Sequence, residues 1–122
     1  MRLQESGEMY LESIYVLSKS QGTVRSIDIS AYMGYSKPSV SRAVSLLKNG
    51  GYITMDNDNL ISLTESGLEI AQKIFERHTL IANLLIRLGV SEKVAAEDAC
   101  KMEHAISDES FEAIRRHMIE HS

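Results

Sequence analysis

The stretch SIDISAYMGYSKPSVSRAVSLLKN at residues 26–49, followed by GGYITMDNDNLISL at 50–63, decides the fold of this chain. Its first part predicts a short helix that has Ser26 as its N-cap and that ends at Gly34. Ser36 is predicted to cap a second helix, with Pro38 in the first turn, where the missing N–H of proline costs nothing. Two short helices joined by a tight turn that contains glycine indicate a helix-turn-helix.

The residues on either side of this stretch extend the prediction. Apolar residues between 5 and 19 recur at three- and four-residue steps and predict a preceding helix. Two β-prone runs, at 52–55 and 60–63, flank four turn-forming residues and predict a hairpin. Three helices followed by a hairpin are the element order of a winged helix-turn-helix, which we expect to form a DNA-binding domain over residues 1–64.

The remainder of the chain, residues 65–122, is predicted to be entirely helical. Thr64, Ser91 and Ser107 are expected to cap three helices, which extend to about residues 88, 105 and 120. The predicted fold is therefore mainly α, with an N-terminal winged helix-turn-helix and a helical second domain.

Composition limits the class of protein. The chain has 122 residues, of which 43% are hydrophobic, and no apolar run approaches the length of roughly 18 residues that a membrane span needs. We therefore expect no membrane partner. No signal peptide is evident, and the single cysteine excludes an internal disulfide, which favours a reducing cytoplasm.

The charge is divided unevenly between the two predicted domains. The net charge is −4, with 13 basic and 17 acidic residues. Residues 1–64 contain six of each sign, whereas residues 65–122 contain seven basic and 11 acidic side chains. The overall charge therefore conceals a basic segment at 25–49, in which Asp28 is the only acid.

The helix predicted at 36–49 is suited to binding DNA. It contains hydroxyl and cationic side chains but no acid, and phosphate oxygens and base edges accept hydrogen bonds from such groups. The hairpin turn, by contrast, contains Asp56 and Asp58. A solvated face in a purely structural winged helix is the alternative. The candidate DNA-binding residues are Arg25, Ser36, Lys37, Pro38, Ser39, Ser41, Arg42 and Lys48.

A second set of residues is typical of a metal site. Cys100, Glu103 and His104 have the spacing i, i+3 and i+4, which places a thiol, a carboxylate and an imidazole on one face of a helix. Met9 and Glu12 have the same one-turn spacing on the first predicted helix. Sulfur ligands argue against magnesium or calcium and favour Fe(II), Co(II), Ni(II) or Zn(II).

Each of these residues also has an ordinary structural interpretation. A lone cysteine or methionine is often a core residue, and a lone histidine often has only a structural role in the core. His117 and His121, spaced i and i+4 near the end of the chain, form a rival pair of ligands.

Three motifs resemble a known family. EMYLESIY at 8–15, SKPSVS at 36–41 and CKMEHAISDE at 100–109 are similar to iron- and manganese-dependent repressors of the diphtheria toxin repressor and manganese transport regulator type. The resemblance implies a homodimer that binds palindromic double-stranded DNA only when metal is bound. It also implies that residues 65–122 carry out dimerisation and metal binding.

The resemblance also implies the roles of individual ligands. Met9, Cys100, Glu103 and His104 match the primary, activating site of the iron-type branch. Glu12 and His78 match positions that complete a second site in the manganese-type branch. The two sulfur ligands favour Fe(II) as effector, with Mn(II) as the alternative and Co(II), Ni(II) or Zn(II) possible in vitro.

The sequence also departs from the family. Ala82 and Ala96 replace a carboxylate and an imidazole of the iron-type ancillary site, and Arg42 replaces a glutamine that is usual on the recognition helix. We expect a two-domain form without the SH3-like third domain. No catalytic residue is predicted, although a Cys/Glu/His metal centre could activate water in a small metalloenzyme. A DNA-binding protein controlled by a small molecule, or binding constitutively, is the other alternative.

Overall fold

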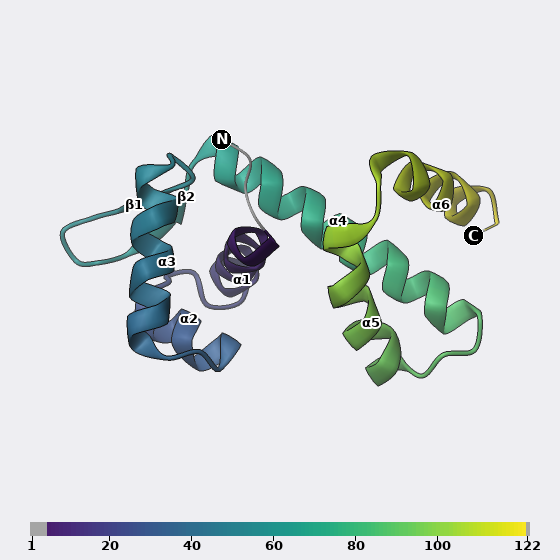
Figure 1. Ribbon diagram of the computed structural model, residues 1–122, viewed down its shortest axis with the longest axis horizontal. Coiled ribbons are helices and arrows are strands. Elements are labelled where there is room, and N and C mark those ends of the chain that lie inside the picture. The colour runs from purple at the N-terminus through teal and green to yellow at the C-terminus, as the bar shows by residue number, and fades with distance from the viewer. Residues whose placement is uncertain (1–4, 122) are drawn as a thin grey trace. The chain divides into compact units, whose positions relative to one another are not determined.

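The computed structural model describes residues 5–121, which form six helices and one two-stranded sheet (Figure 1). The mainly α fold predicted from the sequence is confirmed. The elements, in chain order, are α1 (Glu5–Gln21), α2 (Ser26–Met33), α3 (Lys37–Asn49), β1 (Ile53–Met55), β2 (Ile61–Leu63), α4 (Glu65–Arg87), α5 (Glu92–Ala105) and α6 (Asp108–Glu120).

The chain divides into two compact units, one that ends at Gln72 and one that begins at Lys73. The division falls inside α4, so the first turns of this long helix belong to the first unit and the rest belong to the second. The domain boundary expected between residues 64 and 65 stays a prediction.

The first unit is a winged helix-turn-helix. Helix α1 packs against α2 and β2, and α3 packs against α2 and β1. Strands β1 and β2 pair antiparallel, with Ile53 opposite Leu63 and Met55 opposite Ile61. Apolar side chains from all these elements and from the start of α4 form one core: Tyr10, Leu11, Ile14, Leu17, Val24, Ile29, Val40, Val44, Leu47, Ile53, Ile61 and Ala71.

The helix boundaries in this unit follow the predicted caps, with one correction. The Ser36 hydroxyl oxygen accepts the N–H of Ser39 at 3.3 Å and begins α3 as expected. The N-cap of α2, however, is Arg25 and not Ser26. The prediction of Ser26 was wrong because the carboxylate of Asp28 accepts the N–H of Arg25 at 2.8 Å, which moves the helix start one residue earlier.

The second unit contains the remainder of α4 together with α5 and α6. Its helices begin as predicted, since Ser91 accepts the N–H of Val94 and Ser107 accepts the N–H of Ser110. The side chains of Ile74, Ile81, Ala95, Ala99, Phe111 and Met118 are buried. None of the helices among the described residues is long and apolar enough to cross a membrane.

Candidate metal centre and DNA-facing helix

The candidate metal centre lies in the second unit and is built around Glu103. The helix α5 forms over Glu92–Ala105 as predicted, so Cys100, Glu103 and His104 lie within little more than one turn. The side chain of Glu103 is only 1% exposed, and that of His104 is 2% exposed. A carboxylate buried so completely is costly unless positive charge or hydrogen-bond donors face it.

Each oxygen of this buried carboxylate faces one imidazole. Oε2 of Glu103 lies 3.0 Å from Nδ1 of His78 on α4, and Oε1 lies 3.2 Å from Nε2 of His104. Sγ of Cys100 lies 3.7 Å from the same His78 nitrogen. One ligand atom from each of His78, Cys100 and Glu103 falls within 4.8 Å of the others. The second unit therefore brings a thiol, a carboxylate and two imidazoles together.

This donor set fits a first-row divalent transition metal. Thiolate and imidazole are ligands for iron, cobalt, nickel and zinc, whereas calcium and magnesium prefer oxygen alone. A divalent cation would also balance the negative charge of the buried Glu103 carboxylate. The residues present are therefore chemically suited to hold the metal that the sequence predicted.

The ligand atoms of the second unit form one connected group. The sequence predicts Cys100, Glu103 and His104 in a primary site and His78 in a second site. In the second unit Cys100 lies beside His78, and Glu103 contacts both imidazoles. The division of these residues into a primary and a second site stays a prediction.

The two remaining predicted ligands lie on α1 in the first unit. Met9 and Glu12 are one helical turn apart, as the predicted helix requires. The backbone carbonyl of Met9 accepts a hydrogen bond from the Ser13 hydroxyl at 2.8 Å. Their role as ligands stays a prediction.

The rival pair of histidines is close together but separate from this cluster. The rings of His117 and His121 lie 4.3 Å apart, centroid to centroid, near the end of α6. Neither belongs to a group of three or more metal-ligating side chains among residues 5–121.

Arg77, which is only 6% exposed, was not among the residues predicted to belong to the site. Its guanidinium donates to the backbone carbonyls of Glu103 and Ile106 and to the carboxylate of Asp108. Its position directly before the candidate ligand His78, and the presence of Glu103 and Asp108 in one quoted motif, were the only available signals.

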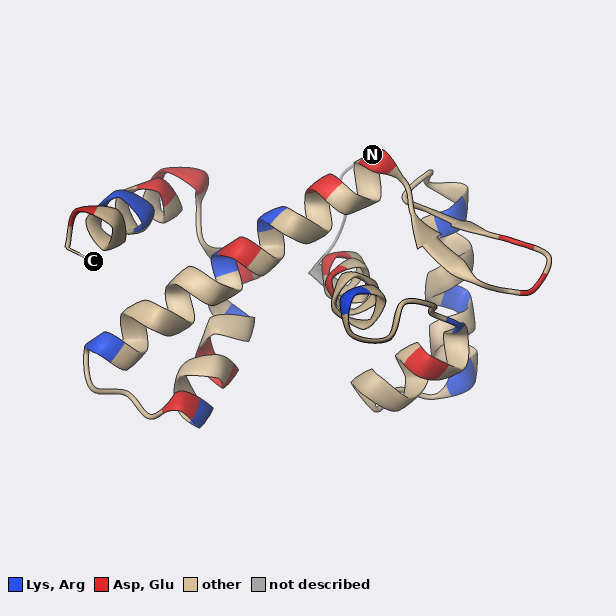
Figure 2. Ribbon diagram, turned by 180° about the vertical axis from the view of Figure 1, so that it is seen from behind, with Lys and Arg blue, Asp and Glu red and all other residues tan. Residues whose placement is uncertain are grey.

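The predicted DNA-facing helix α3 has the expected polarity. Val40, Val44 and Leu47 are buried in the core, which leaves the cations Lys37, Arg42 and Lys48 exposed. Figure 2 shows basic residues along α3 and no acidic ones, whereas the hairpin turn between β1 and β2 is acidic. This is the charge pattern expected of a helix that approaches the phosphate backbone.

The other predicted DNA-binding residues lie at the two ends of the helix-turn-helix and on α3. Ser36 and Pro38 occupy the start of α3, Ser41 is exposed, and Ser39 is half-buried. Arg25 extends to the hairpin, where its Nε donates to the carbonyl of Asp58 at 3.3 Å. Leu46, an exposed apolar side chain on α3, was not among the residues predicted for this surface.

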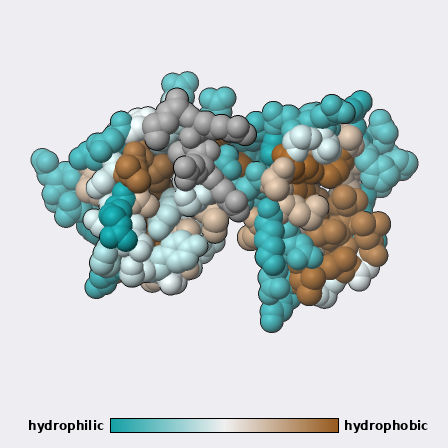
Figure 3. Space-filling view, in the orientation of Figure 1, coloured by the Kyte–Doolittle hydropathy of each residue, from teal (hydrophilic) through white to brown (hydrophobic). Residues whose placement is uncertain are grey.

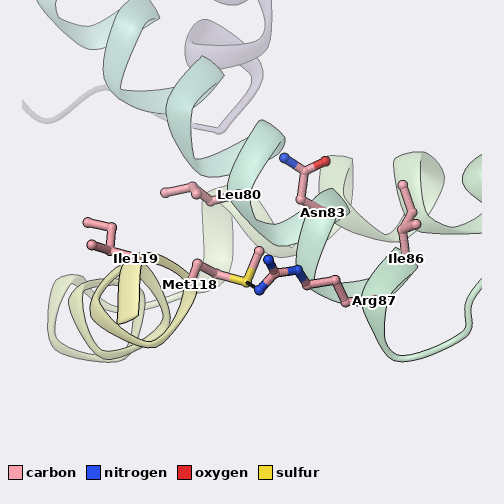
Figure 4. Close-up of a pocket in the computed structure, with 6 residues that line it drawn as sticks. All are labelled: Leu80, Asn83, Ile86, Arg87, Met118 and Ile119. Atoms are coloured by element: carbon pink, nitrogen blue, oxygen red, sulfur yellow. Dashed lines mark hydrogen bonds between the residues drawn. The ribbon is translucent and has the colours of Figure 1, made fainter. Parts of the chain in front are cut away.

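An apolar surface covers part of the second unit. Exposed apolar side chains on its three helices include Ile86, Val94, Met102 and Ile119, and Leu88 in the turn after α4 is also exposed. Figure 3 shows hydrophobic side chains gathered on this unit. An open groove is lined by Leu80, Asn83, Ile86 and Arg87 of α4 and by Met118 and Ile119 of α6 (Figure 4). Nη1 of Arg87 lies 3.8 Å from Sδ of Met118 in this groove. A contribution of α6 to this surface was not predicted from the sequence.

One unit is a winged helix with a basic recognition helix, and the other places an exposed thiol and two imidazoles around a buried carboxylate. Together these features define a metal-dependent DNA-binding regulator. Comparison with known proteins gives the same class. Residues 2–59 match the family description "Iron dependent repressor, N-terminal DNA binding domain". Residues 64–121 match "Iron dependent repressor, metal binding and dimerisation domain". The chain belongs to this family of metal-dependent transcriptional repressors.

Individual relatives agree with the family assignment. The chain is 38% identical to the transcriptional regulator MntR of Escherichia coli over 106 residues, which cover 87% of this chain and 68% of MntR. It is 35% identical to an HTH-type transcriptional regulator of Methanocaldococcus jannaschii, over 93% of this chain and 92% of that protein.

A solved structure extends the likeness to three dimensions. The manganese regulator SloR superposes with a TM-score of 0.80 at 28% identity, covering 97% of this chain. The chain spans about half of SloR, since the match covers 54% of that protein. Because these relatives are transcriptional regulators, the metalloenzyme interpretation is set aside.

Proposed function

We propose that the protein is a homodimeric transcriptional repressor that binds palindromic DNA when Fe(II) occupies the centre around Glu103. The observation that carries this proposal is the nearly complete burial of the Glu103 carboxylate between the imidazoles of His78 and His104, with Cys100 beside His78. Two imidazoles, a thiol and a buried carboxylate thus lie together at one point of a helical unit. A single cysteine, Cys100, is compatible with a reducing cytoplasm as the location of the protein.

The choice of Fe(II) rests on the ligand chemistry. Cys100 supplies a soft donor, and softer donors favour Fe(II) over Mn(II), which prefers oxygen. The comparisons point both ways, because the family description names iron whereas SloR is a manganese regulator. Mn(II) at the same centre is therefore the alternative effector. We propose that Met9 and Glu12 complete the ligand set, as the sequence predicts.

The side chains around Glu103 indicate how a bound metal would act on the protein. When bound, the cation supplies positive charge that the carboxylate, thiolate and imidazoles share. His78 of α4 and Glu103 of α5, which face one another at 3.0 Å, would hold the cation from two helices. Metal activates DNA binding if the arrangement that binds DNA also binds metal more tightly than the other arrangements do.

The proposal is tested by measuring binding to the DNA upstream of the chain's own gene, with a fluorescent label, under anaerobic conditions. We expect Fe(II) to promote binding and a chelator to abolish it. The His104→Ala variant should lose the response, while the His117→Ala/His121→Ala double variant, which also removes imidazole, should retain it. DNA binding that ignores metal would support the constitutive alternative, and an equal loss in both variants would contradict the assigned centre.

The proposed DNA interface has its own test. Each phosphate contact by a cation changes the slope of log K against log salt concentration by about 0.9. We expect Lys48→Ala to reduce the magnitude of this slope by about 1.8 for the dimer, since each subunit loses one contact, because Lys48 is exposed on the last turn of α3. Lys93→Ala, on α5 of the second unit, is the matched control. A slope unchanged by Lys48→Ala would remove this residue from the interface.

A further inference from the structure

Arg77 is the buried cation of the second unit, and its surroundings account for its burial. It precedes His78 on α4 and is 6% exposed. A buried charge is tolerated only when paired and hydrogen-bonded, and removing one partner of such a group is costly. The guanidinium makes four contacts, each to a residue at the end of α5 or the start of α6, through Nη1, Nη2 and its face, while its buried Nε has no hydrogen-bond partner among the described residues.

Two of these contacts are with the end of α5. Nη1 donates to the carbonyl of Glu103 at 3.2 Å and to the carbonyl of Ile106 at 2.9 Å. The last four carbonyls of a helix have no partner within it, and this end of the helix is the negative end of its dipole. Arg77 therefore supplies both hydrogen bonds and positive charge where α5 lacks them.

The other contacts are with the start of α6. Nη2 donates to the Asp108 carboxylate, and the guanidinium lies over the Phe111 ring, 5.3 Å from its centroid. One side chain of α4 thus connects the end of α5 to the start of α6. The exposed Lys73 also contacts Asp108, at 3.3 Å, so Asp108 has a second cationic partner.

The contacts converge on Glu103. Two consecutive residues of α4 bind it, since Arg77 holds its backbone carbonyl and His78 faces its carboxylate. We propose that Arg77 is a positioning residue of the metal centre, which fixes the end of α5 so that Glu103 and His104 present their ligand atoms together. This inference rests on the proposed metal-dependent function and adds the residue that sets the geometry of its ligands.

The test uses Co(II) as the probe, because its visible absorption reports ligand geometry and its affinity can be measured against a competing chelator. Residues that orient metal ligands typically change affinity about 10–100-fold when replaced. We expect Arg77→Met to weaken Co(II) binding by at least about tenfold and to alter the absorption spectrum. Lys73→Met is the matched control, because it loses a contact with Asp108 but none with Glu103, and it should stay within about twofold.

A second measurement separates positioning from folding. Far-UV circular dichroism establishes that each variant is folded, and amide hydrogen exchange in the metal-free protein should show lost protection at the end of α5 in Arg77→Met alone. If Arg77→Met does not fold, Arg77→Lys, which keeps the charge but loses the planar fork, should show a smaller loss of Co(II) affinity with an altered spectrum.

Three results would overturn the inference. The first is a folded Arg77→Met, or Arg77→Lys in its place, that binds Co(II) with unaltered affinity and spectrum. The second is a loss of Co(II) affinity in Lys73→Met as large as that in the Arg77 variant. Failure of the unaltered chain to bind Co(II) at all would instead contradict the proposed metal-dependent function, and the positioning role with it.

Discussion

Cys100 is the single residue whose chemistry bears most directly on which metal the centre selects. Its sulfur lies 3.7 Å from the His78 nitrogen that also faces Glu103, so a change of donor atom here changes the set without disturbing the buried acid. We expect Cys100→Asp to lower affinity for Fe(II) relative to Mn(II), because a carboxylate oxygen is a harder donor than a thiolate. The measurement is a competition titration with both metals under anaerobic conditions.

Cys100→Ala is the control for this change of donor. It removes the sulfur without supplying oxygen, so it should weaken the binding of both metals. If Cys100→Asp left the ratio of Fe(II) to Mn(II) affinity unchanged, Cys100 would not be a ligand that discriminates between them.

The two cations beside Asp108 lead to a prediction of how the stability of the protein depends on pH. Lys73 and then Arg77 hold the pKa of its carboxyl below the usual value. A group with a lower pKa in the folded state binds fewer protons there than in the unfolded chain, so its stabilising contribution is present above its unfolded pKa of about 4. That contribution is lost as the pH falls through the lower, folded pKa.

The measurement compares the melting temperatures of the metal-free wild type and Asp108→Asn across this range. The variant should melt at a lower temperature near neutral pH, and the difference should shrink below about pH 4 and vanish in stronger acid. Glu112→Gln, which removes an exposed acid of the same helix, should show a smaller effect. If the difference in melting temperature between the wild type and Asp108→Asn stayed constant down to acid pH, the charge of Asp108 would not be the cause of its stabilising effect.

At the scale of elements, the first turn of α4 is fixed by Gly67. A Cβ at this position would lie 2.0 Å from the backbone oxygen of Tyr52, which precedes β1. Glycine to alanine within a helix usually stabilises by about 0.5–1 kcal/mol, but a clash with backbone cannot be relieved by a rotamer change. We therefore expect Gly67→Ala to destabilise the protein by about 2 kcal/mol or more, as measured by urea unfolding.

Gly50→Ala is the matched control for this substitution. Its Cβ would meet the ring of Tyr52 at 2.9 Å, and a side-chain ring can move where a backbone carbonyl cannot. Its φ of −77° is ordinary for alanine, so we expect a smaller change in the free energy of unfolding. Equal effects of the two substitutions would mean that the contact between α4 and Tyr52 is not the cause.

The elements also show how far sequence reasoning extends. Caps and periodicity act within a few residues, so Ser36, Ser91 and Ser107 were sufficient to predict where three helices begin. The same local rules failed at Ser26, because a side-chain contact from Asp28 to the backbone of Arg25 competed with it.

The site was predictable in part for the same reason. Spacing along one helix brings Cys100, Glu103 and His104 together, but it does not determine which oxygen of Glu103 faces which imidazole. That depends on the packing of α4 against α5, which also places Cys100 beside His78. The role of Arg77 depends on two backbone carbonyls at the end of α5 and on a carboxylate, which are 26 to 31 residues away in sequence. No local sequence pattern marks such contacts.

At the scale of the whole molecule, the second unit leaves an apolar surface that its own helices do not cover. Leu88 is 72% exposed and Ile119 is 61% exposed, at the end of α4 and on α6. Surfaces of this kind mark protein–protein contacts, and the family description of residues 64–121 includes dimerisation. We propose that a second copy of the chain covers this surface, and a palindromic operator would follow from the twofold symmetry of such a dimer.

This proposal predicts that assembly can be separated from metal binding. Ile119→Glu introduces a charge beside the groove of α4 and α6, far in sequence from the ligands, and should convert the protein to a monomer in sedimentation equilibrium. Ile27→Glu, at an equally exposed apolar position on α2, should remain dimeric. Because Glu103, His78 and Cys100 belong to one chain, the monomer should still bind Co(II), but its affinity for a palindrome should fall towards that for a single half-site. Dimers that persist in Ile119→Glu would place the interface on another face of the unit.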